Sequence, residues 1–228
     1  MFPITEVPDF HLPGAVTVIL FSMLCALLAM GFSIILYRGH HYTAKRIPNP
    51  WIRALIGAFA LIALTALNQR FFTGALDFNG GGLIEKAFRG EPAWYSFLFK
   101  ILFPCVCIFG SFKGGEIVPT LTIGACFGAA FAQLFHLPVQ LYAGIGIAAF
   151  FVGMTNSPFS SLLLCFELFG FEGMPYYAFA IAVSFTLSGY YGLYTSQKFP
   201  YSKTEALFIN RKGPRKLWEH PGDAAEEN

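Results

Sequence analysis

The chain has 228 residues, of which 55% are hydrophobic, 18% aromatic and only 12% charged. This charged share is about half of that in an ordinary soluble domain, so the composition excludes most water-soluble folds and indicates an integral membrane protein in a lipid bilayer. The formal net charge is only +2, and no stripe of basic and aromatic residues follows one segment, which argues against nucleic acid as a partner.

Basic residues gather in two regions of the chain. One group flanks the break between the first two apolar segments and the other crowds the C-terminal end: Arg38, Lys45, Arg46 and Arg53, then Lys198, Lys203, Arg211, Lys212, Arg215 and Lys216. Because basic loops stay on the cytoplasmic side, we expect a multi-pass protein of the cell membrane with a cytoplasmic C-terminus. The five cysteines lie in apolar runs without the spacing of metal ligands, so neither a metal nor a cofactor is expected.

The first half of the chain contains two predicted spans and one partial helix. Residues 14–37 carry no charge and are long enough to cross a bilayer core of about 30 Å as a helix. A basic turn is expected next, and residues 51–67 form the second span. The sequence NGGG at residues 79–82 then breaks the chain, and residues 83–88 are too short to cross, which predicts a partial helix.

Further apolar runs follow at residues 94–109, 120–134, 141–154, 158–169 and 175–194. Gly124 and Gly128 are four residues apart, which predicts close contact with another helix. Ser157 as N-cap and Pro158 as first helical residue predict the start of one run. Several pieces are too short or too broken for simple crossings. Broken helices at membrane depth are tolerated where they line a cavity or are buried in protein, so the pattern indicates a transport protein.

The predicted spans divide the chain into three parts. These are an N-terminal segment (residues 1–13), a transmembrane region (residues 14–210) and a polar cytoplasmic tail (residues 211–228).

The sequence GGEIVP at residues 114–119 stands at the entrance to one apolar run. The first N–H groups of a helix have no partner, and together with the positive end of the helix dipole they bind anions without a full positive charge. Gly114 and Gly115 let the backbone turn and approach a ligand closely, and Pro119 favours a helix start. GGEIVP therefore predicts an anion site, although a simple helix-breaking loop could have the same composition.

Three motifs resemble the CLC family of chloride channels and transporters. GGEIVP followed by TLTIGACFGA is similar to the family signature, in which a Gly-Gly-x-x-x-Pro turn opens a helix whose first amides coordinate the permeating anion. FFVGMTNSPFSSLLLCFELFG at residues 150–170 resembles the family's pair of helices with a short Pro-containing link. KFPYS at residues 198–202 is similar to the motif that carries the family's central tyrosine. The order of the three motifs also matches.

The resemblance implies an all-α integral membrane fold in which this chain supplies the second inverted repeat, with several broken or partial helices and with the first repeat missing. It implies that the backbone amides of Glu116 and Ile117 contact the ion and that Tyr201 directs its hydroxyl at it. The residues expected at the anion site are Gly114, Gly115, Glu116, Ile117, Val118, Pro119 and Tyr201. The resemblance further implies a homodimer with one pore per subunit.

The implied activity is the transport of a small anion, with chloride as the first expectation, through a channel or a proton-coupled exchanger. No catalysis is implied. Glu116 departs from typical chloride members, which carry an apolar residue there, and Gly-Gly-Glu resembles the fluoride-exporting branch. That branch often has Thr where this chain has Val118. Fluoride/proton exchange is therefore the alternative. Glu116 is either a proton-linked carboxylate, whose pKa a bound anion raises, or a carboxylate that only stabilises a helix start.

Two rival interpretations belong to other classes. An intramembrane enzyme would need a nucleophile and a base at membrane depth, but Ser160 and Ser161 lack a nearby histidine. An incomplete fragment that is inactive alone is the other rival, because the GGEIVP entrance and the short pieces around Asn156 would then face lipid. Glu167 lies in an apolar run, so we expect it to face protein and to be hydrogen-bonded there.

Overall fold

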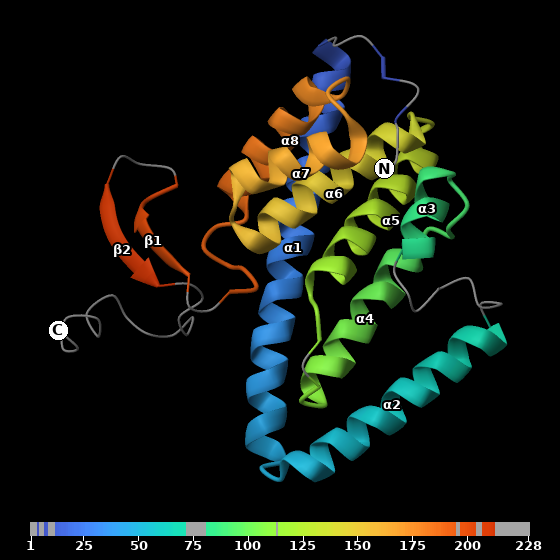
Figure 1. Ribbon diagram of the computed structural model, residues 1–228, viewed down its shortest axis with the longest axis vertical. Coiled ribbons are helices and arrows are strands. Elements are labelled where there is room, and N and C mark those ends of the chain that lie inside the picture. Colours follow the sequence, from blue (N-terminus) through green and yellow to red (C-terminus); the bar gives the residue numbers. More distant parts are fainter. Residues whose placement is uncertain are drawn as a thin grey trace.

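The computed structural model describes residues 4, 7–8, 12–71, 81–112, 114–194, 197–203 and 207–212. Within these residues the chain forms helices and one short hairpin, arranged as Figure 1 shows: α1 (Leu12–Arg46), α2 (Pro50–Phe71), α3 (Gly81–Phe88), α4 (Ser96–Phe109), α5 (Ile117–Phe135), α6 (Val139–Thr155), α7 (Pro158–Phe169), α8 (Met174–Leu187), β1 (Lys198–Tyr201) and β2 (Phe208–Lys212).

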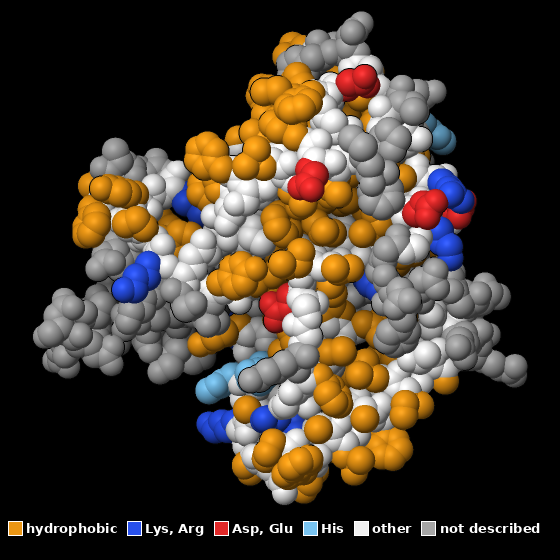
Figure 2. Space-filling view, in the orientation of Figure 1, with side chains coloured by type: hydrophobic (Ala, Val, Ile, Leu, Met, Phe, Trp, Pro, Cys, Tyr) orange, Lys and Arg blue, Asp and Glu red, His pale blue; other side chains and the backbone are white. Residues whose placement is uncertain are grey.

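Three helices in the described part of the chain are long and apolar enough to cross a membrane: Leu12–Arg46, the Pro50–Asn68 part of α2, and α5. Four shorter apolar helices accompany them, namely α4, α6, α7 and α8. The prediction of a helical membrane protein with partial helices is therefore confirmed, and the short helix predicted at residues 83–88 is present as α3. Figure 2 shows the expected surface, with hydrophobic side chains spread over the face of the molecule and few charges among them.

Three details differ from the prediction. The turn expected after residue 37 comes later, because α1 continues through the basic residues to Arg46 and the chain turns at residues 47–49 before α2 begins. Helix α8 ends at Leu187 rather than at residue 194. The KFPYS motif forms β1, which pairs with β2 in an antiparallel hairpin, so the all-α description has one local exception.

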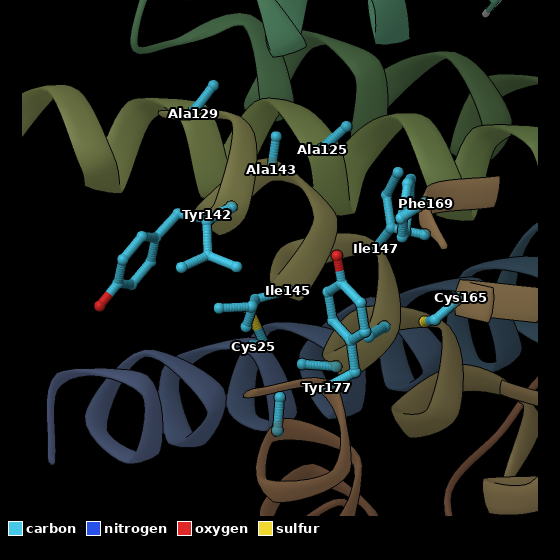
Figure 3. Close-up of a cluster of buried hydrophobic side chains, with 14 of the residues drawn as sticks. Cys25, Ala125, Ala129, Tyr142, Ala143, Ile145, Ile147, Cys165, Phe169 and Tyr177 are labelled. Atoms are coloured by element: carbon cyan, nitrogen blue, oxygen red, sulfur yellow. The ribbon is translucent and has the colours of Figure 1, made fainter. Parts of the chain in front are cut away.

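Helix α6 lies at the centre of the core. It contacts α5 most extensively and also packs on α1, α8, α7 and α3. Side chains from four helices meet around it in Figure 3, for example Cys25 of α1, Ala125 of α5, Cys165 of α7 and Tyr177 of α8. A helix that is apolar on all sides requires burial on all sides, and α6 is buried from Leu141 to Phe150 without interruption.

Helices α5 and α6 approach each other at their glycines, as the spacing of Gly124 and Gly128 predicts. A Cβ atom on Gly128 would overlap the carbonyl group of Tyr142 on α6. Backbones that touch in this way gain close packing in lipid, where no hydrophobic force drives helices together. The contact fixes the direction of α5 and with it the position of the GGEIVP end.

Helix α2 lies largely apart from this core and diverges from the bundle in Figure 1. It contacts α4, where Gly57 lies against Gly110, and α1. Many of its described side chains are exposed, for example Trp51 by 83% and Phe59 by 65%. An apolar surface of this extent needs lipid or another protein around it.

Candidate anion-binding site

The predicted anion site is the start of α5. Ile117 is the first helical residue, and the first helical hydrogen bond runs from the Thr120 N–H to the Glu116 carbonyl over 3.1 Å. Glu116 occupies the N-cap position, but its carboxylate makes no capping bond. Pro119 has no N–H group, so the amides of Ile117 and Val118 remain as donors with no partner among the described residues. These donors and the helix dipole make the end electropositive.

The surroundings of this helix end are open. Gly114 and Gly115 are exposed, and a Cβ atom added to either would meet no atom of the chain within 4 Å. Ile117 and Val118 are 47% and 50% exposed. Neither glycine adopts a left-handed backbone, so local conformation does not require glycine here. What the two glycines provide is free space beside the amides, which a small anion or another segment can occupy.

Two threonines that the sequence prediction did not single out shape the first turn of α5. The Thr120 hydroxyl donates to the Glu116 carbonyl over 2.7 Å, and the Thr122 hydroxyl donates to the Val118 carbonyl over 2.8 Å. Both side chains are fully buried. Their bonds satisfy the hydroxyl groups and hold the first turn in place. The available signal was the spacing of four residues between each threonine and its acceptor.

The carboxyl group of Glu116 is half-buried at this entrance, and burial raises its pKa above the ordinary value of 4.5. The group therefore takes up a proton at a higher pH than an exposed glutamate does. If Glu116 only stabilised the helix start, its carboxylate would be expected to accept a hydrogen bond from one of the first amides of α5. No such hydrogen bond is present at this N-cap.

Tyr201 lies on β1, at some distance along the chain and outside the helical bundle. In Figure 1 the hairpin stands beside the bundle, whereas α5 begins near its middle. The Tyr201 side chain is 66% exposed, its ring packs edge-on against Phe208 at 5.8 Å, and its hydroxyl has no partner among the described residues. The contacts of the described chain therefore do not bring Tyr201 to residues 114–119, although the hydroxyl is available as a donor.

Asn156 itself is not exposed, whereas Phe159 is 83% exposed, so the expectation that the pieces around Asn156 would face lipid holds for only part of them. It ends α6 in a left-handed conformation (φ 54°), and its side chain is only 7% exposed. Its amide Nδ2 donates to the Tyr191 carbonyl over 2.8 Å, and the Leu193 N–H donates to the Met154 carbonyl over the same distance. The segment after α8 covers the C-terminal end of α6 in this way.

Helix α7 begins at Pro158 as predicted, but the hydroxyl of Ser157 bonds to the Thr155 carbonyl instead of capping the helix. The expectation that Glu167 faces protein is wrong. The buried face of α7 consists of Ser161, Cys165 and Phe169, spaced by four residues, and Glu167 projects from the opposite face. It has no hydrogen-bond partner within the described part of the chain.

The sequence of this chain is similar to those of known proteins. Residues 1–189 match the family described as "Voltage gated chloride channel". The chain is 31% identical over 205 residues to a "Chloride/fluoride channel protein" of Pseudomonas syringae pv. tomato, covering 89% of this chain and 45% of that protein. It is 27% identical over 180 residues to an uncharacterised protein of Methanocaldococcus jannaschii, covering 75% of this chain and 43% of that protein.

A solved structure is also similar. The crystal structure of a CLC-type fluoride/proton antiporter superimposes with a TM-score of 0.76 at 28% sequence identity, covering 84% of this chain and 48% of that one. The chain thus spans about half the length of the relatives it matches.

Proposed function

Because this chain belongs to the voltage-gated chloride channel family of membrane transport proteins, we propose that it forms part of a transmembrane path for a small anion, with chloride as the leading substrate. The observation that carries the proposal is the start of α5, where the amides of Glu116, Ile117 and Val118 have no partner among the described residues and stand beside two exposed glycines. Such a helix end binds an anion without a fixed positive charge, which favours release as well as binding.

The site residues act as a group in this proposal. The amides of Glu116, Ile117 and Val118 donate to the anion, Gly114 and Gly115 leave room for it, Pro119 fixes the first turn, and the Tyr201 hydroxyl is a further donor. Tyr201 reaches the anion only if the hairpin closes on the bundle or a second protein segment completes the site. The similarity of KFPYS to the family motif and the free hydroxyl support this role.

Fluoride/proton antiport is the second candidate function, and Glu116 favours it. A carboxyl group with a raised pKa beside an anion-binding helix end can carry a proton in step with the anion. The similar solved structure is titled a fluoride/proton antiporter, and the Pseudomonas relative is named for both ions. Flux measurements with both anions decide between the two candidates.

The remaining parts of the proposal concern assembly and placement. The chain spans about half of its relatives, so a first repeat is expected to supply the rest of the path, and the complete protein is expected to be a homodimer. The basic residues near the ends of the helical region support a cytoplasmic C-terminus in the cell membrane.

The test adds a methyl group next to the amides. Gly115→Ala should leave the fold intact, because its Cβ meets no atom of the chain, but it should reduce anion flux by about tenfold because a bound ion would lie beside that position. The assay is chloride and fluoride efflux from liposomes that contain the chain co-expressed with the first repeat of a relative. Gly31→Ala on α1 is the matched control, since its Cβ also enters open space. Equal flux for wild type and Gly115→Ala would contradict the proposed site.

A further inference from the structure

Lys203 lies two residues after Tyr201, and its side chain turns back from the hairpin to the helices. Its ammonium group donates to three oxygens from two helix ends: Asn156 Oδ1 at the end of α6, the Phe185 carbonyl of α8 at 2.8 Å, and the Ser188 hydroxyl at 3.3 Å. An ammonium has three N–H donors, so all of them are used in this position. Lys203 makes no ion pair with an acid in the described part of the chain.

The position suits a cation for two reasons. The last carbonyls of a helix lack partners and carry the negative end of the helix dipole, and the Phe185 carbonyl belongs to this last turn of α8. Aromatic faces also attract cations, and the Lys203 ammonium lies 4.1 Å from the centre of the Phe185 ring, with the rings of Tyr190 and Phe199 within 6 Å.

The backbone around Lys203 is held as well. Its N–H donates to the Tyr190 hydroxyl over 3.2 Å, and the same hydroxyl donates to the Ser202 hydroxyl over 3.2 Å. The Ser202 N–H donates to the Leu207 carbonyl over 2.9 Å. The chain therefore passes directly from the exposed Tyr201 into a fixed point on the bundle, with one residue between them.

We propose that Lys203 is the positioning residue for Tyr201, because its ammonium anchors the Tyr201 segment to the C-terminal ends of α6 and α8. The role of Lys203 in positioning Tyr201 rests on the proposed function, in which the Tyr201 hydroxyl donates to the anion. The attachment of the segment to the helix ends by Lys203 does not depend on that function. Lys203 does not contact the anion, because its donors are all engaged.

The first measurement is hydrogen–deuterium exchange of the 228-residue chain in detergent, read on peptides that cover residues 190–203. Lys203→Met keeps the length of the side chain and removes its donors. Asn156 Oδ1 then loses its hydrogen bond, whereas the Phe185 carbonyl still accepts one from the Ser188 hydroxyl over 3.2 Å. Exchange should become about tenfold faster, as expected for the loss of a charge-assisted group of hydrogen bonds. Lys203→Arg should restore part of the protection. Lys198→Met, which changes an exposed lysine on β1 just before Lys203, should change nothing.

The outcomes distinguish the two proposals. Unchanged exchange in Lys203→Met, with unchanged helical content, overturns the positioning role whatever the anion assay shows. Faster exchange together with a weaker chloride or fluoride affinity in Lys203→Met and in Tyr201→Phe supports both proposals. Faster exchange with an affinity that neither variant changes keeps the anchor and overturns only the role of Tyr201 at the anion.

Discussion

Gly124 of α5 and Gly146 of α6 face each other so closely that a Cβ atom on Gly124 would lie 2.5 Å from the Gly146 carbonyl oxygen. A Cβ atom on Gly146 would overlap the Gly124 carbonyl in turn. Both clashes involve backbone, which cannot rotate away as a side chain can. The helix that carries the candidate site is therefore positioned by contact between two backbones.

Gly124→Ala should destabilise the chain, because α5 and α6 must separate to admit the methyl group. We expect a loss of about 1–3 kcal/mol, in the range of overpacked sites. Thermal unfolding in detergent measures it. Gly31→Ala is the matched control, and it should stabilise the chain by about 0.5–1 kcal/mol, because the methyl group enters open space in a helix. Equal unfolding temperatures for Gly124→Ala and wild type would show that the contact is not as tight as described.

Tyr201→Phe should weaken anion binding in a protein that contains this half, because it removes the hydroxyl donor and keeps the ring. A lost hydrogen bond to a charged partner corresponds to about a tenfold or greater loss of affinity. Titration calorimetry with chloride and with fluoride measures the effect. Tyr194→Phe is the control, since Tyr194 is a comparably exposed tyrosine outside the hairpin. Unchanged affinity in both Tyr201→Phe and Tyr201→Ala would rule out the proposed role.

Glu116→Gln should change the pH dependence of anion flux and leave the fold intact, because the amide keeps the shape of the side chain and does not titrate. Since burial raises the pKa of Glu116 above 4.5, the wild-type flux should change at a pH above that value, where the carboxyl group gains its proton as the pH falls. Flux curves from acid to neutral pH, recorded for both proteins, test this. Parallel curves would leave Glu116 with a structural role only.

The chain alone should not transport anions, because its candidate helix end lies uncovered on the surface of the chain. An unsatisfied backbone group exposed to lipid costs several kcal/mol. Liposomes with the purified chain should show no selective efflux of chloride or fluoride, and co-expression with the first repeat of a relative should restore it. Saturable, anion-selective efflux from the chain alone would contradict the half-path interpretation. It would require a different pore, such as one formed by two identical chains in antiparallel arrangement.

The helices and the candidate helix end could be predicted from the sequence because their signals are local. Pro158 marks the start of α7, the glycine spacing predicts the α5–α6 contact, and GGEIVP precedes α5 directly. The resemblance to the family supplies what composition does not, namely which helix end is the candidate for binding the ion.

Other features depend on contacts between residues far apart in the chain. Lys203 was counted only as one basic residue near the C-terminus, because nothing in its neighbourhood reveals that Asn156, 47 residues earlier, supplies an acceptor. The direction of Glu167 is predicted wrongly because α7 is apolar on nearly every side, so its sequence gives no clear direction for burial. The packing of α7 on α6 and α8 decides that the face with Ser161, Cys165 and Phe169 is the buried one.

The burial of α6 on every side and the exposure of α2 have a consequence for how relatives of this chain diverge. A substitution in α6 changes volume against several helices at once, so few residue types fit at each position. A substitution in α2 meets few side chains of this chain over most of the helix, so an apolar residue of similar hydrophobicity serves. Across many relatives we therefore expect the sequence of α6 to change slowly and to retain its small residues. We expect the sequence of α2 to change rapidly among apolar residues, except at Gly57, where it touches Gly110.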